Sequence, residues 1–152
     1  LNLLETSYLL VRLPAYAVNR TKRLMKAPKL YWGDLGVAMH LGGGAEPSGA
    51  HLENLVLEDL CAWRDARLDR AEMYYWRTTT GEEVDFVVEV GDRLLPIEVK
   101  ATSRPHVGDA THLRVFRAEY GERALPGLLL HGGAETEWLT ADALAVPWWK
   151  VI

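Results

Sequence analysis

The sequence predicts a mixed α/β (α+β) fold for this chain of 152 residues. Apolar residues at helical spacing alternate with short apolar runs, in the order helix, three strands, helix, strand. That order is typical of a sheet covered by helices. Hydrophobic residues make up 49% of the chain and charged residues 25%, which excludes disordered and collagen-like classes.

The first third of the chain is predicted to hold the end of a helix, two strands and a linker. Residues 1–11 carry leucines at helical spacing, and residues 11–17 and 29–32 are expected to be strands. Between these strands lies the basic stretch 19–26. A helix followed by a basic hairpin is typical of the end of a winged helix; a solvated basic loop is the alternative. The glycines between 42 and 49 predict a linker and no phosphate loop, because no Gly-Lys-Ser/Thr follows them.

From His51 onward the pattern is more regular. The following elements are expected: an amphipathic helix at 51–63, a strand at 73–78, a turn at 79–82, strands at 84–90 and 94–100, a helix at 109–120, and strands at 125–131 and 136–139. The end at 147–149 has no assignment.

Charge is distributed unevenly along the chain. Residues 1–33 hold six basic residues and one acidic residue, a net charge of +5, and the remainder holds eleven basic and twenty acidic residues, a net charge of −9. A negative balance opposes contact with nucleic-acid phosphates, which the basic first part could still make. The opposite charges indicate two functions or a boundary between domains.

The single cysteine, Cys61, excludes an internal disulfide and fits a reducing cytoplasm. No apolar run approaches the roughly 20 residues that a membrane helix needs, and no signal peptide begins the chain. We therefore expect a cytoplasmic protein without a membrane partner. The chain opens inside an apolar pattern without an initiator methionine, so a fragment of a longer protein is expected. The five histidines show no zinc-ligand spacing.

Gly91-Asp92 is a preferred turn and is expected to join the two strands beside it into a hairpin. Residues whose numbers add up to 183 then face each other, which places Asp85 opposite Glu98, with Lys100 on the same face. A slip by one residue would expose the apolar set, so this register is well specified. The apolar side, expected to face the core, holds Val84, Phe86, Val88, Val90, Leu95, Ile97 and Val99.

Two carboxylates directly opposite each other in a sheet are destabilising unless something neutralises them. A Mg²⁺ ion bound by Asp85 and Glu98 would do so, and it could activate a water molecule and offset charge on a phosphate. Lys100 could orient or deprotonate that water, or stabilise the developing oxyanion. The trio therefore suits phosphodiester hydrolysis. The alternative is a solvated outer face on which Lys100 pairs with both acids.

A third acid is expected from the helix that precedes the sheet. Glu53 falls inside or at the edge of the apolar arc of that helix, where a carboxylate needs a partner or a metal. Glu58 falls on the solvent side, and Asp59 lies near the arc. Position on the helix therefore ranks Glu53 first among the candidates for the third acid, and Glu58 and Asp59 remain alternatives.

The segments 49–53, 84–87 and 97–102 resemble the PD-(D/E)XK nucleases, especially their archaeal Holliday junction resolvase branch. The resemblance implies a restriction-endonuclease-like αβββαβ core around Mg²⁺ or Mn²⁺, and DNA as the partner. It implies Asp85, Glu98 and Glu53 as metal ligands and, together with Lys100, as the catalytic residues. Thr102 or Ser103 could contact phosphate. Arg104 and His106 could do so too, although a solvated loop is the simpler interpretation.

A wider resemblance rests on segments 29–38, 75–77 and 83–87, which are similar to the uncharacterised C-terminal domain of prokaryotic AAA-type ATPases. It implies a preceding ATPase module, where ATP would bind, and a winged helix. Residues 1–48 are then a partial winged-helix tail and linker, and residues 49–152 a PD-(D/E)XK nuclease-like domain. Metal-dependent DNA hydrolysis is the expected function. The alternatives are a non-catalytic DNA-docking or regulatory module, or an assembly domain that forms a homo-oligomer.

Overall fold

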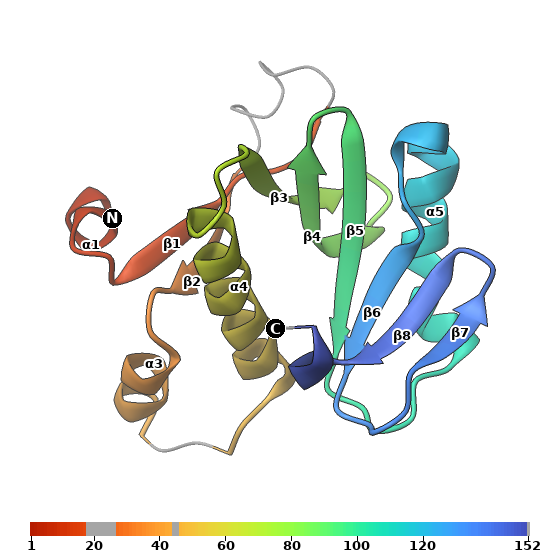
Figure 1. The fold of residues 1–152 in the computed structure, drawn as a ribbon. Coiled ribbons are helices and arrows are strands. Elements are labelled where there is room, and N and C mark those ends of the chain that lie inside the picture. Colours follow the sequence, from red (N-terminus) through yellow and green to blue (C-terminus); the bar gives the residue numbers. More distant parts are fainter. Residues whose placement is uncertain (18–26, 44–45, 152) are drawn as a thin grey trace.

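The computed structural model describes residues 1–17, 27–43 and 46–151. In these ranges the fold is α+β, with a six-stranded sheet, a two-stranded sheet and four α-helices (Figure 1). The helices are α1 (Asn2–Thr6), α3 (Leu35–Leu41), α4 (Gly49–Asp65) and α5 (Thr111–Tyr120). The strands are β1 (Leu10–Leu13), β2 (Lys29–Trp32), β3 (Ala71–Arg77), β4 (Glu83–Val90), β5 (Arg93–Lys100), β6 (Gly127–His131), β7 (Glu137–Thr140) and β8 (Ala143–Pro147).

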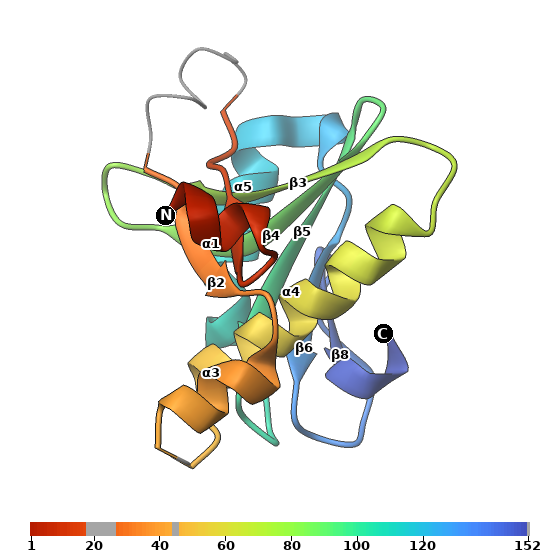
Figure 2. The same cartoon turned by 90° about the vertical axis from the view of Figure 1, so that its left-hand side faces the viewer.

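The large sheet has the strand order β3-β4-β5-β6-β8-β7, and both of its faces are covered. Figures 1 and 2 show α4 on one face and α5 on the other. Strand β5 lies inside the sheet, antiparallel to β4 and parallel to β6. Polar side chains away from the ends of β5 therefore have little access to water.

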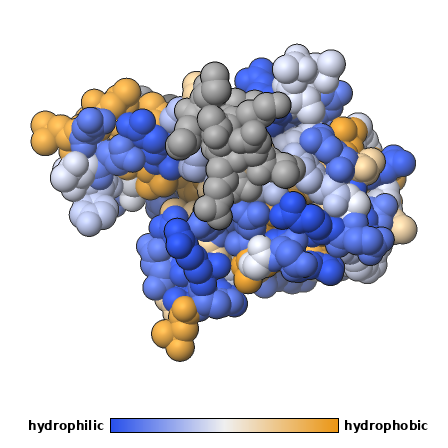
Figure 3. All heavy atoms as spheres, turned by 90° about the horizontal axis from the view of Figure 1, so that it is seen from above, coloured by the Kyte–Doolittle hydropathy of each residue, from blue (hydrophilic) through white to orange (hydrophobic). Residues whose placement is uncertain are grey.

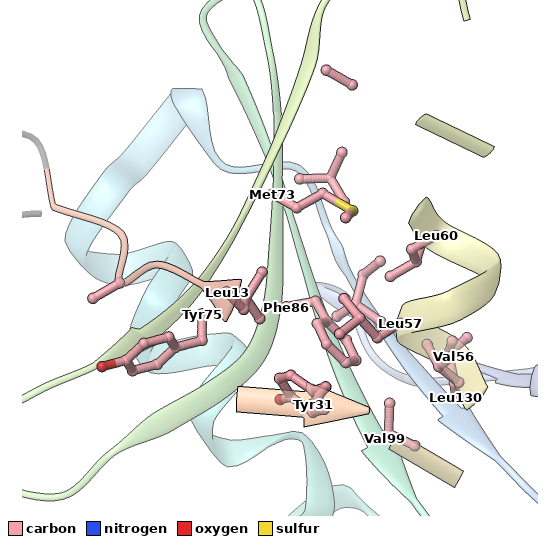
Figure 4. Close-up of a cluster of buried hydrophobic side chains, with 14 of the residues drawn as sticks. Leu13, Tyr31, Val56, Leu57, Leu60, Met73, Tyr75, Phe86, Val99 and Leu130 are labelled. Carbon is pink, nitrogen blue, oxygen red and sulfur yellow. The ribbon is translucent and has the colours of Figure 1, made fainter. Parts of the chain in front are cut away.

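The face beneath α4 holds the larger apolar cluster. Leu57 of α4 packs there with Phe86 of β4 and Val99 of β5, and Tyr31 of β2 joins the same cluster (Figure 4). The second strand of the small sheet is thus part of the core of the large one. The other cluster lies beneath α5 and includes Phe116 and Val87.

The predicted hairpin register is confirmed from Phe86 opposite Ile97 to Val90 opposite Arg93. Gly91 has a φ of +61°, the left-handed conformation that favours glycine in such a turn. The ladder ends at Phe86, so Asp85 and Glu98 do not form the ladder pair that the sequence predicted.

A β-bulge explains why the predicted pairing fails at this point. From Tyr74 to Trp76 strand β3 advances by two residues, whereas the paired residues of β4, Val87 and Val84, are three apart. The extra residue reverses the alternation of faces. The prediction that Val84 shares the face of Phe86 was therefore wrong, and Val84 packs in the cluster beneath α5.

The N-terminal helix is shorter than predicted. Helix α1 ends at Thr6, and the Ser7 hydroxyl donates back to the Leu3 carbonyl. The chain then turns through Tyr8 and enters β1, which pairs with β2. The Gly33 backbone N–H donates to the Leu9 carbonyl. A Cβ atom at position 33 would collide with the Tyr8 carbonyl oxygen, so this turn requires a glycine there.

Other elements near the chain ends also differ from the predictions. The strand expected at 11–17 ends at Leu13, and only an isolated bridge from Ala15 to Tyr75 continues it. Helix α3 and strand β8 were not predicted. The basic stretch 19–26, and with it the predicted basic hairpin loop, lies outside the described residues.

Helix α1 buries none of its residues. Figure 3, seen from above Figure 1, shows hydrophobic side chains exposed at this end of the molecule. They include Leu1, Leu3, Leu4 and Leu9. Among the described residues, no helix is long and apolar enough to span a membrane.

We predict that Leu57→Ala lowers the free energy of unfolding by about 2–5 kcal/mol, because Leu57 is fully buried between α4 and the sheet. Leu68→Ala is the matched control, since Leu68 is fully exposed, and should change it by less than about 0.5 kcal/mol. Urea unfolding of both variants checks this. Equal, small effects would contradict the packing described for α4.

Candidate functional site

Four carboxylate side chains gather where β4 and β5 approach β2 and the first half of α4. We call them the carboxylate cluster: Glu53, Glu83, Asp85 and Glu98. Lys29 contacts the first three, and the charge of Asp85 acts on Glu98. The cluster therefore joins three acids predicted from the sequence with one, Glu83, that was not, and Lys29 was not predicted either.

Asp85 is positioned by the bulge in β4. Where the ladder ends, its Oδ2 atom accepts a hydrogen bond from the Val99 backbone N–H at 2.9 Å. The carboxylate thus takes the place of a ladder carbonyl and holds the ends of β4 and β5 together. Its Oδ1 atom faces Lys29, with 3.5 Å between Oδ1 and Nζ.

Glu98 is the most deeply buried of the four acids, with 3% of its surface exposed. Its Oε1 atom accepts a hydrogen bond from Lys100 Nζ at 2.7 Å, and His112 Nδ1 lies 4.0 Å from the same oxygen. Its Oε2 atom is buried and has no hydrogen-bond partner. The alternative of a solvated outer sheet face is therefore right in part: Lys100 pairs with Glu98 as expected, but this face is not solvated, because α5 covers this side of β5.

Glu53 is the helix acid that the structure brings to the cluster. Its Oε1 atom accepts from Lys29 Nζ at 3.2 Å and from the Tyr31 hydroxyl. Glu58 instead accepts from Asn54 and is half-buried rather than on the solvent side as predicted. Asp59 lines a separate apolar groove at the other end of α4.

Sequence reasoning missed Lys29, Tyr31 and Glu83. Lys29 Nζ lies 2.5 Å from Glu83 Oε1, its shortest contact in the cluster. A signal was available, because Lys29 and Tyr31 alternate on one predicted strand, and Glu83 precedes Asp85 by two residues. What the sequence did not show is that β2 lies against α4.

Burial and neighbouring carboxylates raise the pKa values of two acids of the cluster. Burial and the charge of Glu53 raise the pKa of Asp85, although the Val99 N–H and Lys29 oppose this. Burial and the charge of Asp85 raise the pKa of Glu98 to about 7, and the hydrogen bond from Lys100 offsets only part of the shift. The anionic form of this pair is therefore disfavoured in the free protein.

The two lysines remain cationic. Burial lowers the pKa of Lys29, but the hydrogen bond with Glu83 and the charges of Glu53 and Asp85 outweigh burial, so the pKa is raised. Lys100 behaves in the same way: burial lowers its pKa, but the hydrogen bond and the charge of Glu98 outweigh burial, so the pKa is raised. Each lysine thus serves as a charged hydrogen-bond donor.

The residues after β5 have local roles. The Thr102 hydroxyl accepts from the Arg104 backbone N–H, and the His106 backbone N–H donates to Asp109. Ser103 and Arg104 are exposed. The structure therefore gives these residues turn and capping contacts, and their predicted contact with phosphate stays a prediction.

A cleft of about 460 Å³ opens beside the cluster. Lys29, Tyr31 and Glu53 line it, together with parts of α3 and the first turn of α4. His51 in that turn accepts from the Ser48 backbone N–H, which gives it a capping role. Of the four acids of the cluster, Glu53 is the one that lines this cleft.

Within the described ranges, no group of three or more His, Cys, Asp or Glu side chains is arranged to hold a metal ion. The ammonium group of Lys29 lies among three of the carboxylates that could otherwise converge on one. The metal roles of Glu53, Asp85 and Glu98 stay predictions.

The raised pKa of Glu98 predicts a pH dependence of stability. Its folded-state pKa of about 7 exceeds the ordinary 4.5, so its stabilising contribution is complete below about pH 4.5 and is lost as the pH rises through 7. Glu98→Gln removes this loss. The melting temperature of the variant should therefore rise relative to wild type between pH 5 and pH 8, measured by thermal unfolding at constant ionic strength.

Glu122→Gln is the control for this comparison, because Glu122 is exposed and far from the cluster in sequence. Its melting temperature should follow the wild type at each pH. Parallel profiles for Glu98→Gln and wild type would show that Glu98 is not destabilised as an anion.

Comparison with known proteins gives two family matches that meet at residue 48. Residues 48–151 match the model described as Domain of unknown function (DUF4143), and residues 1–48 match Domain of unknown function (DUF8612). The first is a domain often found at the C-terminus of AAA-type ATPases. No solved structure matches the chain.

Two curated relatives are Uncharacterized protein Rv2008c of Mycobacterium tuberculosis and Uncharacterized protein Mb2031c of Mycobacterium bovis. Each is 36% identical over 111 residues, which cover 67% of this chain and 24% of the relative. The chain thus spans about a quarter of the length of these relatives. Since the first family model covers residues 48–151, the chain belongs to the DUF4143 family.

Proposed function

We propose that the carboxylate cluster is the metal centre of a PD-(D/E)XK-like nuclease domain that hydrolyses DNA phosphodiester bonds. The observation that carries this proposal is the buried Glu98 carboxylate, which has one oxygen on Lys100 and the other without a hydrogen-bond partner. A buried carboxylate oxygen without a donor is costly unless a cation or a proton meets it.

The oxygen donors of the cluster are of the kind that a divalent metal ion prefers, although the described side chains are not arranged as a group of three around one point. Mg²⁺ and Mn²⁺ prefer carboxylate oxygens, and Mg²⁺ usually takes only one or two of them beside water and phosphate oxygens. Asp85 and Glu98 would hold the ion, and Glu53 would assist from α4. When bound, such an ion supplies an activated water molecule and offsets charge on the phosphate.

Lys100 would act through its charge. Its pKa is raised above the ordinary value despite burial, so it donates a hydrogen bond and is poorly suited to accept a proton. With 38% of its side chain exposed, it can reach a phosphate oxygen while remaining next to Glu98. Of the roles expected for this lysine, stabilisation of the developing negative charge is the one its electrostatics favour.

The order of elements supports the nuclease-like core. Helix α4, strands β3, β4 and β5, helix α5 and strand β6 follow one another in the order αβββαβ, and β5 is parallel to β6. This is the order that the resemblance implies around the catalytic acids. Strands β8 and β7 extend the sheet beyond it.

DNA would be held by the basic first part of the chain. Residues 1–33 carry a net charge of +5, whereas residues 34–152 carry −9. Phosphate contacts require positive charge, so the acidic part alone is poorly suited to bind a duplex. We propose that helix α1 and the β1–β2 pair are a winged-helix remnant, and that the basic residues of this first part make those contacts.

A parent ATPase module would precede this domain in the full-length protein, because DUF4143 domains are often found at the C-terminus of AAA-type ATPases. The exposed leucines of α1 form the apolar surface that such a module would contact (Figure 3). ATP would bind in that module.

A second candidate function is a non-catalytic DNA-docking or regulatory module. The position of Lys29 favours it, because an ammonium group among three carboxylates offsets part of their mutual repulsion without a metal ion. The two candidates differ in whether the domain cuts DNA.

We predict that the protein nicks supercoiled plasmid or branched DNA when Mg²⁺ or Mn²⁺ is present, and that EDTA abolishes the reaction. Lys100→Met should lower the rate by at least about 100-fold, because it removes a charged donor next to the reacting phosphate. Gel analysis of product formed over time measures both rates.

Lys150→Met is the matched control, since the Lys150 side chain donates to the Ala134 carbonyl and is not a member of the cluster. It should cut like the wild type. Equal rates for Lys100→Met and wild type would overturn the assigned role of Lys100. A wild type that binds the DNA but does not cut it with either metal would support the docking function instead.

A further inference from the structure

Lys29 occupies the centre of the carboxylate cluster. Its Nζ atom lies 2.5 Å from Glu83 Oε1, 3.2 Å from Glu53 Oε1 and 3.5 Å from Asp85 Oδ1. These acids come from α4 and β4, and the lysine comes from β2. One cation therefore lies at the point on which three carboxylates from two other elements converge.

The same point suits a small divalent cation. Carboxylate oxygens approach Mg²⁺ to about 2.1 Å, so an ion there could not share the position with an ammonium group. Like charges a few ångströms apart also repel strongly at low dielectric. An ion held by Asp85 and Glu53 and the Lys29 ammonium thus exclude each other.

A second observation concerns a buried oxygen of the same cluster. The side chain of Glu98 is 4% exposed, and its Oε2 atom has no hydrogen-bond partner. Lys100 meets only its other oxygen. The charges of both Asp85 and Lys29 act on Glu98, so its carboxylate belongs to the same cluster.

We propose that Lys29 is an internal competitor for the divalent metal ion, and that the ion enters the carboxylate cluster only when the Lys29 side chain withdraws. This inference rests on the proposed metal centre and names its regulation. Lys29 has room to withdraw, because its side chain lines the cleft of about 460 Å³ beside Glu53 and is 24% exposed.

Withdrawal has to occur by movement rather than by loss of a proton. The surrounding acids raise the pKa of Lys29, so the group stays charged at neutral pH. An ammonium group in the cleft would face a bound phosphate backbone, which would hold it away from the carboxylates. Substrate and metal would then favour each other's binding.

The test measures Mn²⁺ binding without DNA, by electron paramagnetic resonance of the free ion at neutral pH. Lys29→Met should bind Mn²⁺ at least about tenfold more tightly than the wild type, because a competing charge is removed. Lys150→Met, which removes a lysine outside the cluster, should bind like the wild type. Lys29→Met combined with Asp85→Asn should lose the gain.

A measurement on the unaltered chain keeps the inference testable if Lys29→Met fails to fold, which circular dichroism would show. Acetylation rates of Lys29 and Lys150 are followed by mass spectrometry as Mn²⁺ is added. Displacement by the metal should accelerate acetylation of Lys29 and leave Lys150 unchanged. An unchanged rate at Lys29 while Mn²⁺ binds would overturn the inference.

Failure of this inference can be told apart from failure of the proposed function. Equal Mn²⁺ affinity of the wild type and Lys29→Met would overturn competition by Lys29 but leave a metal-dependent nuclease intact. Absence of Mn²⁺ binding in both proteins would also overturn it, and plasmid nicking by the wild type then decides the proposed function separately.

Discussion

The fold depends on neutralising carboxylates that the sheet keeps away from water. Burying a single ionised carboxylate costs several kcal/mol unless a partner meets it. Here Lys29 forms ion pairs with Glu53, Glu83 and Asp85. Lys100 donates a hydrogen bond to Glu98, and the pKa of Glu98 is raised to about 7. Since Lys29 belongs to β2, the same contacts tie the N-terminal strand pair to α4 and β4.

The site is a consequence of how the sheet is built. Helices cover both faces, so β5 runs through the core and the side chain of Glu98 is removed from solvent. A bulge in β4 turns Asp85 out of the ladder and onto the Val99 N–H. These two features largely bury the two acids, whereas a regular, solvated hairpin would pair them at the surface.

Much of the fold could be predicted because local patterns agree with the tertiary structure. Alternation about Gly91-Asp92 fixed the hairpin register, and helical spacing found α4 and α5. Helix α3 was missed although Asp34 caps it by accepting from the Val37 N–H, a recognisable start signal.

Other features had no local signal. The extra residue in β4 appears only when β3 is paired beside it, so alternation placed Val84 on the wrong face. The contact of Lys29 with Glu53 joins residues 24 positions apart across a gap in the pattern, and no spacing rule predicts it. Three of the four acids could therefore be predicted from the sequence, whereas Glu83 and the position of the lysine among them were missed.

A double-mutant cycle on Lys29 and Asp85 tests most directly whether this ion cluster holds the site together. The free energy of unfolding is measured for wild type, Lys29→Met, Asp85→Asn and the double variant at neutral pH. If the lysine neutralises the cluster, Lys29→Met should cost about 1–3 kcal/mol more in the wild type than in Asp85→Asn. Equal costs, within about 0.5 kcal/mol, would contradict the account.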